Sequence, residues 1–157
     1  MTVEQSVGIV SSLLDGRWLD SEEAAAGALQ ELGFAVPAGA GRQLTGGSVQ
    51  HDLEHPAGID HASLTTAAGE PVSVIFLLSS VPEPQSVVTA ATYRALLAAL
   101  SDLLGAPERV WPDQPTPVQW RTAELDVGAQ LFDRRDSSVM VWVEHRARSQ
   151  QDELRAR

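Results

Sequence analysis

The apolar positions near the N-terminus recur with the 3.6-residue period of an α-helix. This first predicted helix begins at Thr2, which has the capping-box spacing to Gln5, and it ends at the Asp-Gly pair at residues 15–16. Its apolar face consists of Val3, Val7, Val10 and Leu14. The pattern therefore predicts an amphipathic helix with one face against a core.

A second helix is predicted to begin at Asp20 or Ser21. Asp20 and Glu23 form a candidate N-cap pair, and acidic residues in a first turn suit the helix dipole. The expected buried face consists of Ala25, Ala28, Leu29 and Leu32. Gly33 has the position of a left-handed residue after the helix, and Phe34 would then fold back against the last turn.

Three strands are predicted after a Gly- and Ala-rich loop at residues 35–47, at 48–53, 61–66 and 71–79. The turn AAGE joins the last two as a hairpin. Residues 72–78 are apolar at both odd and even positions. This pattern is typical of a central strand that is covered on both faces.

The second half of the chain contains one helix and a closing hairpin. The helix is predicted at residues 88–104, and Gly105 and Pro107 end it. Its apolar stripe consists of Tyr93, Leu96, Leu97, Leu100, Leu103 and Leu104. Residues 111–117 contain three prolines, which exclude regular structure.

Alternating apolar residues then predict strands around Val118 and Trp120, at 125–131 and at 139–143, with DRRDS as the turn between the last two. The polar segment 146–157 is expected to be a frayed helix or disordered. These elements predict one domain over residues 1–157, of the α+β class. Its mainly antiparallel sheet would have five to six strands, with two N-terminal helices and one middle helix packed on one face.

The charge of the chain limits its partners. Formal net charge is −10, and all basic residues are arginines. Residues 1–100 hold 3 arginines against 11 acidic residues, and residues 101–157 hold 8 against 10. Such a chain repels phosphate backbones, so we expect no nucleic-acid partner. An acidic surface can instead steer a basic protein toward it.

Membrane insertion and secretion are not indicated. No apolar run reaches the roughly 18 residues of a membrane span, and the first residues lack the basic start of a signal peptide. The chain has no cysteine, which excludes disulfides and thiolate chemistry. We therefore expect a cytoplasmic protein without a membrane partner.

One segment matches the pattern of a catalytic motif. HDLEH, residues 51–55, has the H-x-x-E-H form in which two histidines hold zinc and a glutamate activates water. His51 and His55 are the candidate ligands with Glu54 as the base, and Asp60 and His61 follow closely. His145 is a more distant candidate.

The context of HDLEH disfavours zinc chemistry. The motif needs a helix, because one turn brings both imidazoles to one metal. Gly46 and Gly47 precede the segment and Pro56 follows it. In an extended chain, His51 and His55 would be about 13 Å apart. The alternative interpretation is a polar edge strand and loop with solvated histidines, and we accordingly expect no metal and no cofactor.

No other catalytic motif is present. The sequence contains no G-x-S-x-G, no P-loop and no G-x-G-x-x-G. Asp133 and Asp136 lie in a predicted turn, where Asp is favoured for backbone reasons. Trp120 and Trp142 lie in predicted strands and are expected in the core, whereas Trp111 lies in the proline-rich segment and is the tryptophan expected to be exposed for contact. These features predict a protein that is not an enzyme.

Several segments resemble a known family. TYRALLAALSDLLGAP, a proline-rich spacer, VQWRTAELDVGAQL and SVMVWV follow one another, and RWLDSEEAAAGALQELGF lies near the N-terminus. Together they cover about half of the chain. They resemble an actinobacterial family of small acidic proteins of uncharacterised domain type, whose members occur beside polymorphic toxin genes and are thought to be immunity proteins.

The resemblance implies an immunity protein that occludes the active site of a cognate, basic toxin. The expected interface is acidic, with Asp52, Glu54, Asp60 and Glu70, and Trp111 as a further contact residue. A first alternative is a secretion chaperone for an effector protein, and a second is a small zinc-dependent hydrolase that uses His51, His55 and His61. A domain that binds a small ligand is also compatible with the sequence. The chain is expected to be a monomer or a homodimer.

Overall fold

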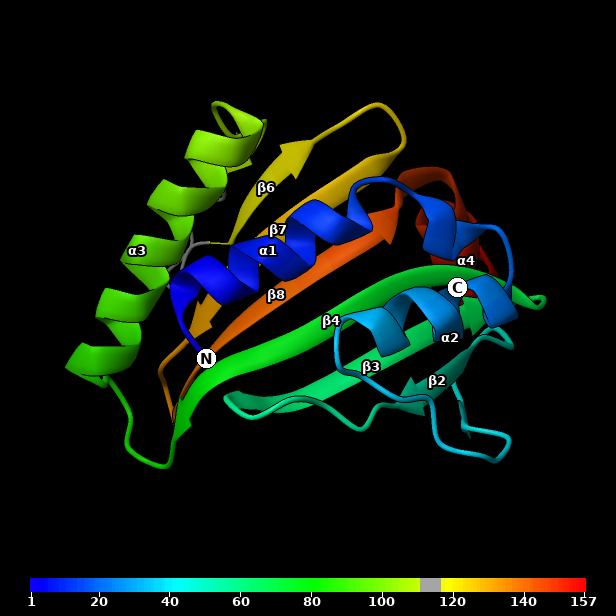
Figure 1. The fold of residues 1–157 in the computed structure, drawn as a ribbon, viewed down its shortest axis with the longest axis horizontal. Helices are drawn as coiled ribbons and strands as arrows, with labels where there is room; N and C mark the ends of the chain where they lie inside the picture. Colours follow the sequence, from blue (N-terminus) through cyan, green and yellow to red (C-terminus); the bar gives the residue numbers. More distant parts are fainter. Residues whose placement is uncertain (111–116) are drawn as a thin grey trace.

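A computed structural model of the chain describes residues 1–110 and 117–157, which form one antiparallel sheet and four α-helices (Figure 1). The predicted contact residue Trp111 therefore lies outside the described residues, as does most of the predicted irregular segment. The strands are β1 (Arg42–Gln43), β2 (Val49–Asp52), β3 (Ile59–Ala67), β4 (Glu70–Val81), β5 (Arg109–Val110), β6 (Val118–Arg121), β7 (Leu125–Phe132) and β8 (Ser137–His145). Their order in the sheet is β1-β2-β3-β4-β8-β7-β6-β5.

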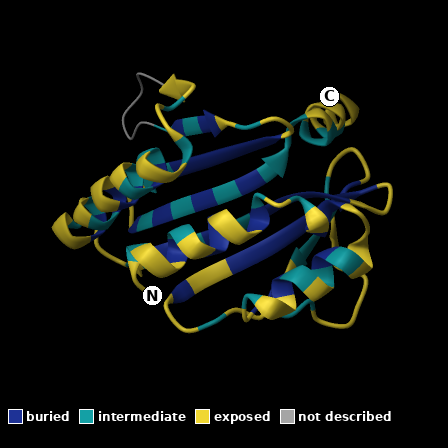
Figure 2. Ribbon diagram, turned by 45° about the horizontal axis from the view of Figure 1, so that its top comes forward, coloured by how far each residue is buried: buried dark blue, intermediate teal, exposed yellow. Residues whose placement is uncertain are grey.

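Three α-helices and one short 3-10 helix cover one face of this sheet. They are α1 (Val3–Leu13), η1 (Arg17–Leu19), α2 (Glu22–Glu31) and α3 (Val87–Leu104). In Figure 1, α1 crosses in front of β7 and β8, and α2 lies in front of β3 and β4. Helix α4 (Arg146–Ala156) continues from β8 and lies beyond the end of that strand (Figure 2).

The predicted α+β class is confirmed, but two details were wrong. The described sheet has eight strands, not five to six, because β1 and β5 form pairs of only two residues. Two residues contain no measurable period, so such edge strands leave no trace in a hydrophobic pattern. The helix arrangement also differs, because the polar tail at 146–157 forms α4.

The helix ends have the capping residues that the sequence predicts. Thr2 and Gln5 form the predicted capping box of α1. Gly33 has a φ of +88°, and the Phe34 amide donates to the Leu29 carbonyl, as predicted for the end of α2. The N-cap of α2 is Ser21, whose hydroxyl accepts from the Ala24 amide. Of the two predicted starting residues, the cap is therefore the serine.

The core lies between the helices and the sheet. Its largest fully buried side chains are Trp18, Trp120, Phe34, Phe76, Leu13, Leu29, Leu64, Leu96 and Leu100. Buried aromatic polar groups find backbone partners: the Trp18 Nε1 donates to the Leu13 carbonyl, and the Tyr93 hydroxyl donates to the Ala129 carbonyl. Tyr93 belongs to α3, which is long and apolar enough to cross a membrane by composition alone. Here its inner residues pack on the sheet.

Strand β8 buries alternate residues in full (Figure 2), and β4 does so from Val74 to Leu78, after four consecutive buried residues at 71–74. In β8, Val139, Val141 and Val143 are buried under the helices. In β4, the buried Val74 and Phe76 alternate with Ile75 and Leu77, which are partly exposed on the other face. The expectation that residues 72–78 are covered on both faces was therefore wrong for these two side chains. Helices α1, α2 and α3 cover one side of the strand, and α4 contacts β4 and β8 near Pro71 and Glu144.

Helix α4 is held by polar contacts, since none of its residues is buried. The Arg148 Nη1 donates to the carbonyl oxygens of Leu19 and Pro71, at 2.9 Å each. The Arg148 Nε lies 3.6 Å from a carboxylate oxygen of Glu70. The Ser149 hydroxyl donates to Glu144 at 2.8 Å. Arg148 therefore links α4 to η1 and to the start of β4, and Arg146 links the first turn of α4 to Asp126 and to the β6–β7 turn.

We predict that Arg148→Ala will release α4 without unfolding the sheet. Hydrogen bonds from a charged donor contribute about 1.5–3 kcal/mol each, and two would be lost. Amide hydrogen exchange should accelerate over residues 146–156, while β4 and β8 keep their protection. Arg155→Ala, at an exposed position of the same helix, is the control and should leave exchange unchanged. Equal protection of α4 in both variants would show that other contacts hold it.

Candidate functional site

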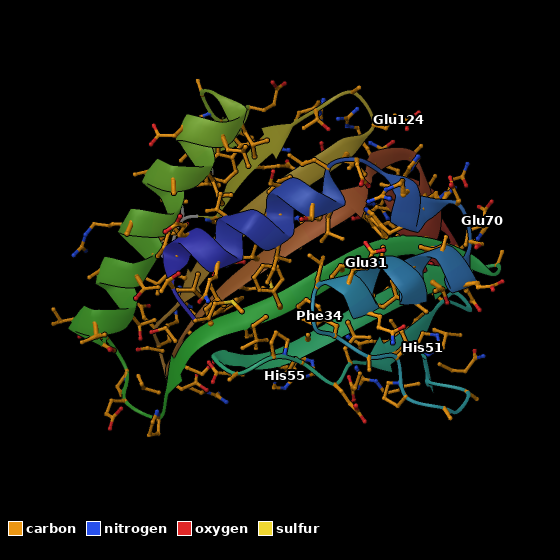
Figure 3. All side chains as sticks on the ribbon, viewed as in Figure 1. Glu31, Phe34, His51, His55, Glu70 and Glu124 are labelled. Carbon is orange, nitrogen blue, oxygen red and sulfur yellow. The ribbon has the colours of Figure 1, made fainter. Side chains whose placement is uncertain are left out.

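The HDLEH segment is a strand end followed by a loop. His51 lies within β2, which ends at Asp52, and Leu53 is buried. The backbone of Glu54 pairs with Ala35, and His55 follows as an exposed residue. Figure 3 shows His51 and His55 well apart along this edge of the molecule. The segment therefore lacks the helical turn that would bring both imidazoles to one metal.

The histidines have separate surroundings. His51 pairs in register with Leu64 and borders a cavity of about 300 Å³ against the loop at 37–41. The His61 Nε2 lies 3.8 Å from an Asp52 carboxylate oxygen. The His55 Nδ1 is 3.5 Å from the Pro56 carbonyl. Within residues 1–110 and 117–157, no group of three His, Asp or Glu side chains is placed to hold a metal.

The four predicted acidic interface residues do not form one surface. Asp52 pairs with His61 as above. An Asp60 carboxylate oxygen accepts from the Ser80 amide at 2.9 Å, at one end of the β3–β4 hairpin. Glu70 lies at the other end, beside Arg148. Seven strand residues separate the two ends, or roughly 23 Å.

Glu54 belongs to an acidic surface that sequence reasoning missed. The pairing of Glu54 with Ala35 places it directly after α2 in space. Residues 20–31 contain four acidic residues and no basic one. We define the α2 acidic surface as the exposed residues Asp20, Glu22, Glu23, Glu31 and Glu54; Figure 3 shows Glu31 on α2. In the sequence, the acidic residues of α2 indicate helix capping, and nothing in their spacing brings Glu54 beside them.

The second surface is the side of the sheet opposite α1, α2 and α3, which we call the open face. Its apolar strip consists of Ile75, Leu77, Phe132, Met140 and Trp142, all of them partly exposed or exposed. In register, Ile75 lies opposite Trp142, and Leu77 lies opposite Met140. A strip of this kind on a sheet is typical of a surface that another protein covers.

The absence of a side chain at Gly128 makes room for the indole of Trp142 at the centre of the apolar strip. Gly128 of β7 pairs with Trp142, and a Cβ atom at Gly128 would lie 1.9 Å from Cζ2 of the indole. The indole therefore lies flat across the backbone of β7 on the open face, so the expected core position is confirmed for Trp120 and was wrong for Trp142. This arrangement presents one face of the ring outward as a wide apolar contact.

Two carboxyl groups lie at the α4 end of the open face. Asp126 is buried, and one of its oxygens accepts from Arg146 Nε at 3.0 Å and from Arg121 Nε at 3.3 Å. Glu144 lies directly opposite Asp126 in the sheet. Burial raises the pKa of Glu144 above its ordinary value of 4.5, and the neighbouring Asp126 and Glu153 carboxylates add to this increase, whereas the Ser149 hydrogen bond opposes it. Hydrogen bonds from Arg146 and Ser149 to these two carboxyl groups connect the end of the sheet to α4.

Comparisons with known proteins give no indication of function. No protein-family model, curated protein or solved structure matches the chain. The α2 acidic surface and the open face are therefore the two candidate functional surfaces, on opposite sides of the sheet.

We predict that zinc does not bind at HDLEH in a stoichiometric manner, because its histidines do not converge. The purified protein should contain far less than one zinc per chain by elemental analysis. The double variant His51→Ala/His55→Ala should keep the melting temperature of the wild type in added zinc. One zinc per chain that disappears in the double variant would contradict the geometry.

We predict that Glu144→Gln will stabilise the fold near neutral pH. A raised carboxyl pKa means that the native state holds the proton more tightly than the unfolded chain does. Stability should therefore fall as pH rises from the unfolded pKa through the folded pKa. Glutamine mimics the protonated form, so its benefit should be present at about pH 7 and absent at about pH 4.

Urea unfolding at both pH values would measure this difference. Glu153→Gln, which removes an exposed carboxylate of α4, is the matched control and should have a smaller effect. A loss of stability in Glu144→Gln at about pH 7 would mean that the ionised carboxylate is favourable in the fold.

Proposed function

We propose that this protein is a cytoplasmic immunity protein that binds a cognate, basic toxin and neutralises it by occluding the toxin's active site. The observation that carries the proposal is the α2 acidic surface, five exposed carboxylates with no basic residue in the helix segment and with Arg17 as a basic neighbour beside Glu31. The resemblance of the chain to immunity proteins supports the same function. In this proposal the protein performs no chemistry.

The α2 acidic surface suits rapid capture. The helix has 10 residues, so its carboxylates extend over about 15 Å. Clustered like charges produce a potential that accelerates encounter with a partner of opposite charge. A fast on-rate matters for an inhibitor, because the toxin acts until it is bound.

Buried residues beneath α2 keep the α2 acidic surface rigid. Ala25 and Leu29 are fully buried, and Trp18 and Leu19 of η1 are buried beside them. The Ala35–Glu54 bridge fixes the chain that leaves the helix. A preorganised surface loses little conformational entropy on binding. Basic clefts that bind anionic substrates also accept carboxylates, so such a surface can occupy a cleft of that kind.

A secretion chaperone is the second candidate. The observation that favours it is the open face, whose apolar strip could hold an extended segment of an effector. The two functions differ in their effect on the partner. An inhibitor abolishes the partner's activity, whereas a chaperone binds a segment away from its active site.

The decisive test begins with the partner. The tagged protein would be purified from cells that carry its gene, the co-purifying protein identified, and the activity of that protein measured with and without this one. We expect stoichiometric inhibition of a basic partner. Binding that leaves the partner's activity unchanged would favour the chaperone.

We predict that the double variant Glu22→Lys/Glu31→Lys will slow association with this partner by at least about tenfold at low salt. The matched control is Glu83→Lys/Glu124→Lys, which changes the net charge equally away from α2; Figure 3 shows Glu124 on the β6–β7 turn. Surface plasmon resonance at two salt concentrations would measure both. Equal on-rates for the two variants would remove the α2 acidic surface from the interface.

A further inference from the structure

We infer that the open face is the surface through which two copies of this protein associate as a symmetric dimer. The inference does not depend on the identity of a toxin. It rests on the apolar strip, on the distribution of charge over the open face, and on the order of residues across one row of the sheet.

The apolar strip occupies the centre of the sheet, not its margin. Ile75 and Leu77 belong to β4, and Met140 and Trp142 belong to β8, which are the two middle strands of eight. The residues around them are mostly uncharged, namely Ser63, Ser73, Gln119, Gly128, Gln130 and Ser138, with His61 beside Leu77 and Glu144 beside Trp142. An apolar centre within a polar ring is the composition of a protein–protein interface.

The charge of the open face decides between partners. Its charged strand positions are three arginines and three acidic residues, Arg42, Arg109, Arg121, Asp52, Asp126 and Glu144, and one histidine, His61, lies opposite Leu77. The open face is thus neutral in a chain whose net charge is −10. A basic partner is attracted to the α2 acidic surface on the other side. Two copies can approach through the open face without bringing their excess charge together.

One row of the open face is complementary to itself. Paired residues place Arg109, Gln119, Gly128, Trp142, Ile75, Ser63 and Asp52 in that order across the sheet. A two-fold axis parallel to the central strands reverses this order in the second copy. Trp142 of each copy then packs on Ile75 of the other and Gln119 faces Asp52, with Arg109 one strand spacing beyond Asp52 and within reach of it through its long side chain. Isologous contacts of this kind are the usual basis of dimers.

The dimensions are compatible with a dimer. Six strands at about 4.8 Å spacing and seven residues along β8 give a flat area of roughly 480 Å². A standard interface buries about 800 Å² on each partner. The strip and its polar ring therefore supply the centre of such an interface, and α4 and the turns would supply its margin. Sheets that pack face to face lie about 10 Å apart, which side chains of this size fill.

Sedimentation equilibrium on the full chain tests the inference. We expect a dimer with a Kd of order 1 µM, and little dependence on salt, because the face is neutral. Leu77→Arg should weaken association by at least about 100-fold. Val88→Arg, at a side chain of α3 that is 71% exposed, is the matched control and should remain dimeric. Circular dichroism and melting temperature would establish that Leu77→Arg is folded.

An exchange of charge between Arg109 and Asp52 tests the dimer even if Leu77→Arg does not fold. Arg109→Asp and Asp52→Arg should each weaken the dimer several-fold, and the double variant should recover it. A wild-type protein that is monomeric at about 100 µM would overturn the inference. So would a dimer that Val88→Arg disrupts and Leu77→Arg does not. A monomer whose Leu77→Arg variant loses a different partner would assign the open face to that partner instead.

Discussion

The pairing of β4 with β8 determines how this molecule is organised. These strands join the N-terminal β1–β4 half of the sheet to the C-terminal β5–β8 half. Their register places Val74 opposite Val143 and Phe76 opposite Val141 under the helices. The same register places Ile75 and Leu77 with Trp142 and Met140 on the open face. A shift by one residue would exchange the two faces, so the core and the surface depend on one alignment.

The single helical layer separates two kinds of surface. Packing of α1, α2 and α3 on the sheet leaves the acidic side chains of α2 exposed on one side of the molecule. The open face on the other side is apolar and electrically balanced. A protein with two such faces can bind a charged partner and a second copy of itself without competition. The α+β frame thus supports the proposed inhibitor and the proposed dimer together, by different physical interactions.

Much of the frame could be predicted from local patterns. The Thr2 capping box, the Gly33 helix end and the closing hairpin follow from residue chemistry within a few positions. Other features could not be predicted, because they depend on distant neighbours. The polar helix α4 is held by Arg148 contacts to carbonyl groups more than seventy residues away in sequence. The apolar run at 72–78 predicts that both faces of the strand are covered. It does not tell whether a helix of the same chain or another molecule covers the second face.

The candidate site shows the same limit. HDLEH matches the zinc motif in sequence, but its backbone is a strand end and a loop, whereas zinc binding requires a helix. Asp52, Asp60 and Glu70 are all acidic in sequence, and each has a different neighbour in the fold: His61, the Ser80 amide and Arg148. Only Glu54 joins the α2 acidic surface, through a backbone bridge that no spacing rule predicts.

The open face is the surface on which, in our proposal, a second copy of this protein packs. The chain contains two methionines, Met1 and Met140, and only Met140 lies on the open face. Methyl NMR of methionine-labelled protein with a soluble paramagnetic agent would therefore report on this face directly. We expect the Met140 signal to lose its broadening as protein concentration rises, while the Met1 signal remains unchanged. A Met140 signal that is broadened equally at every concentration would contradict the account.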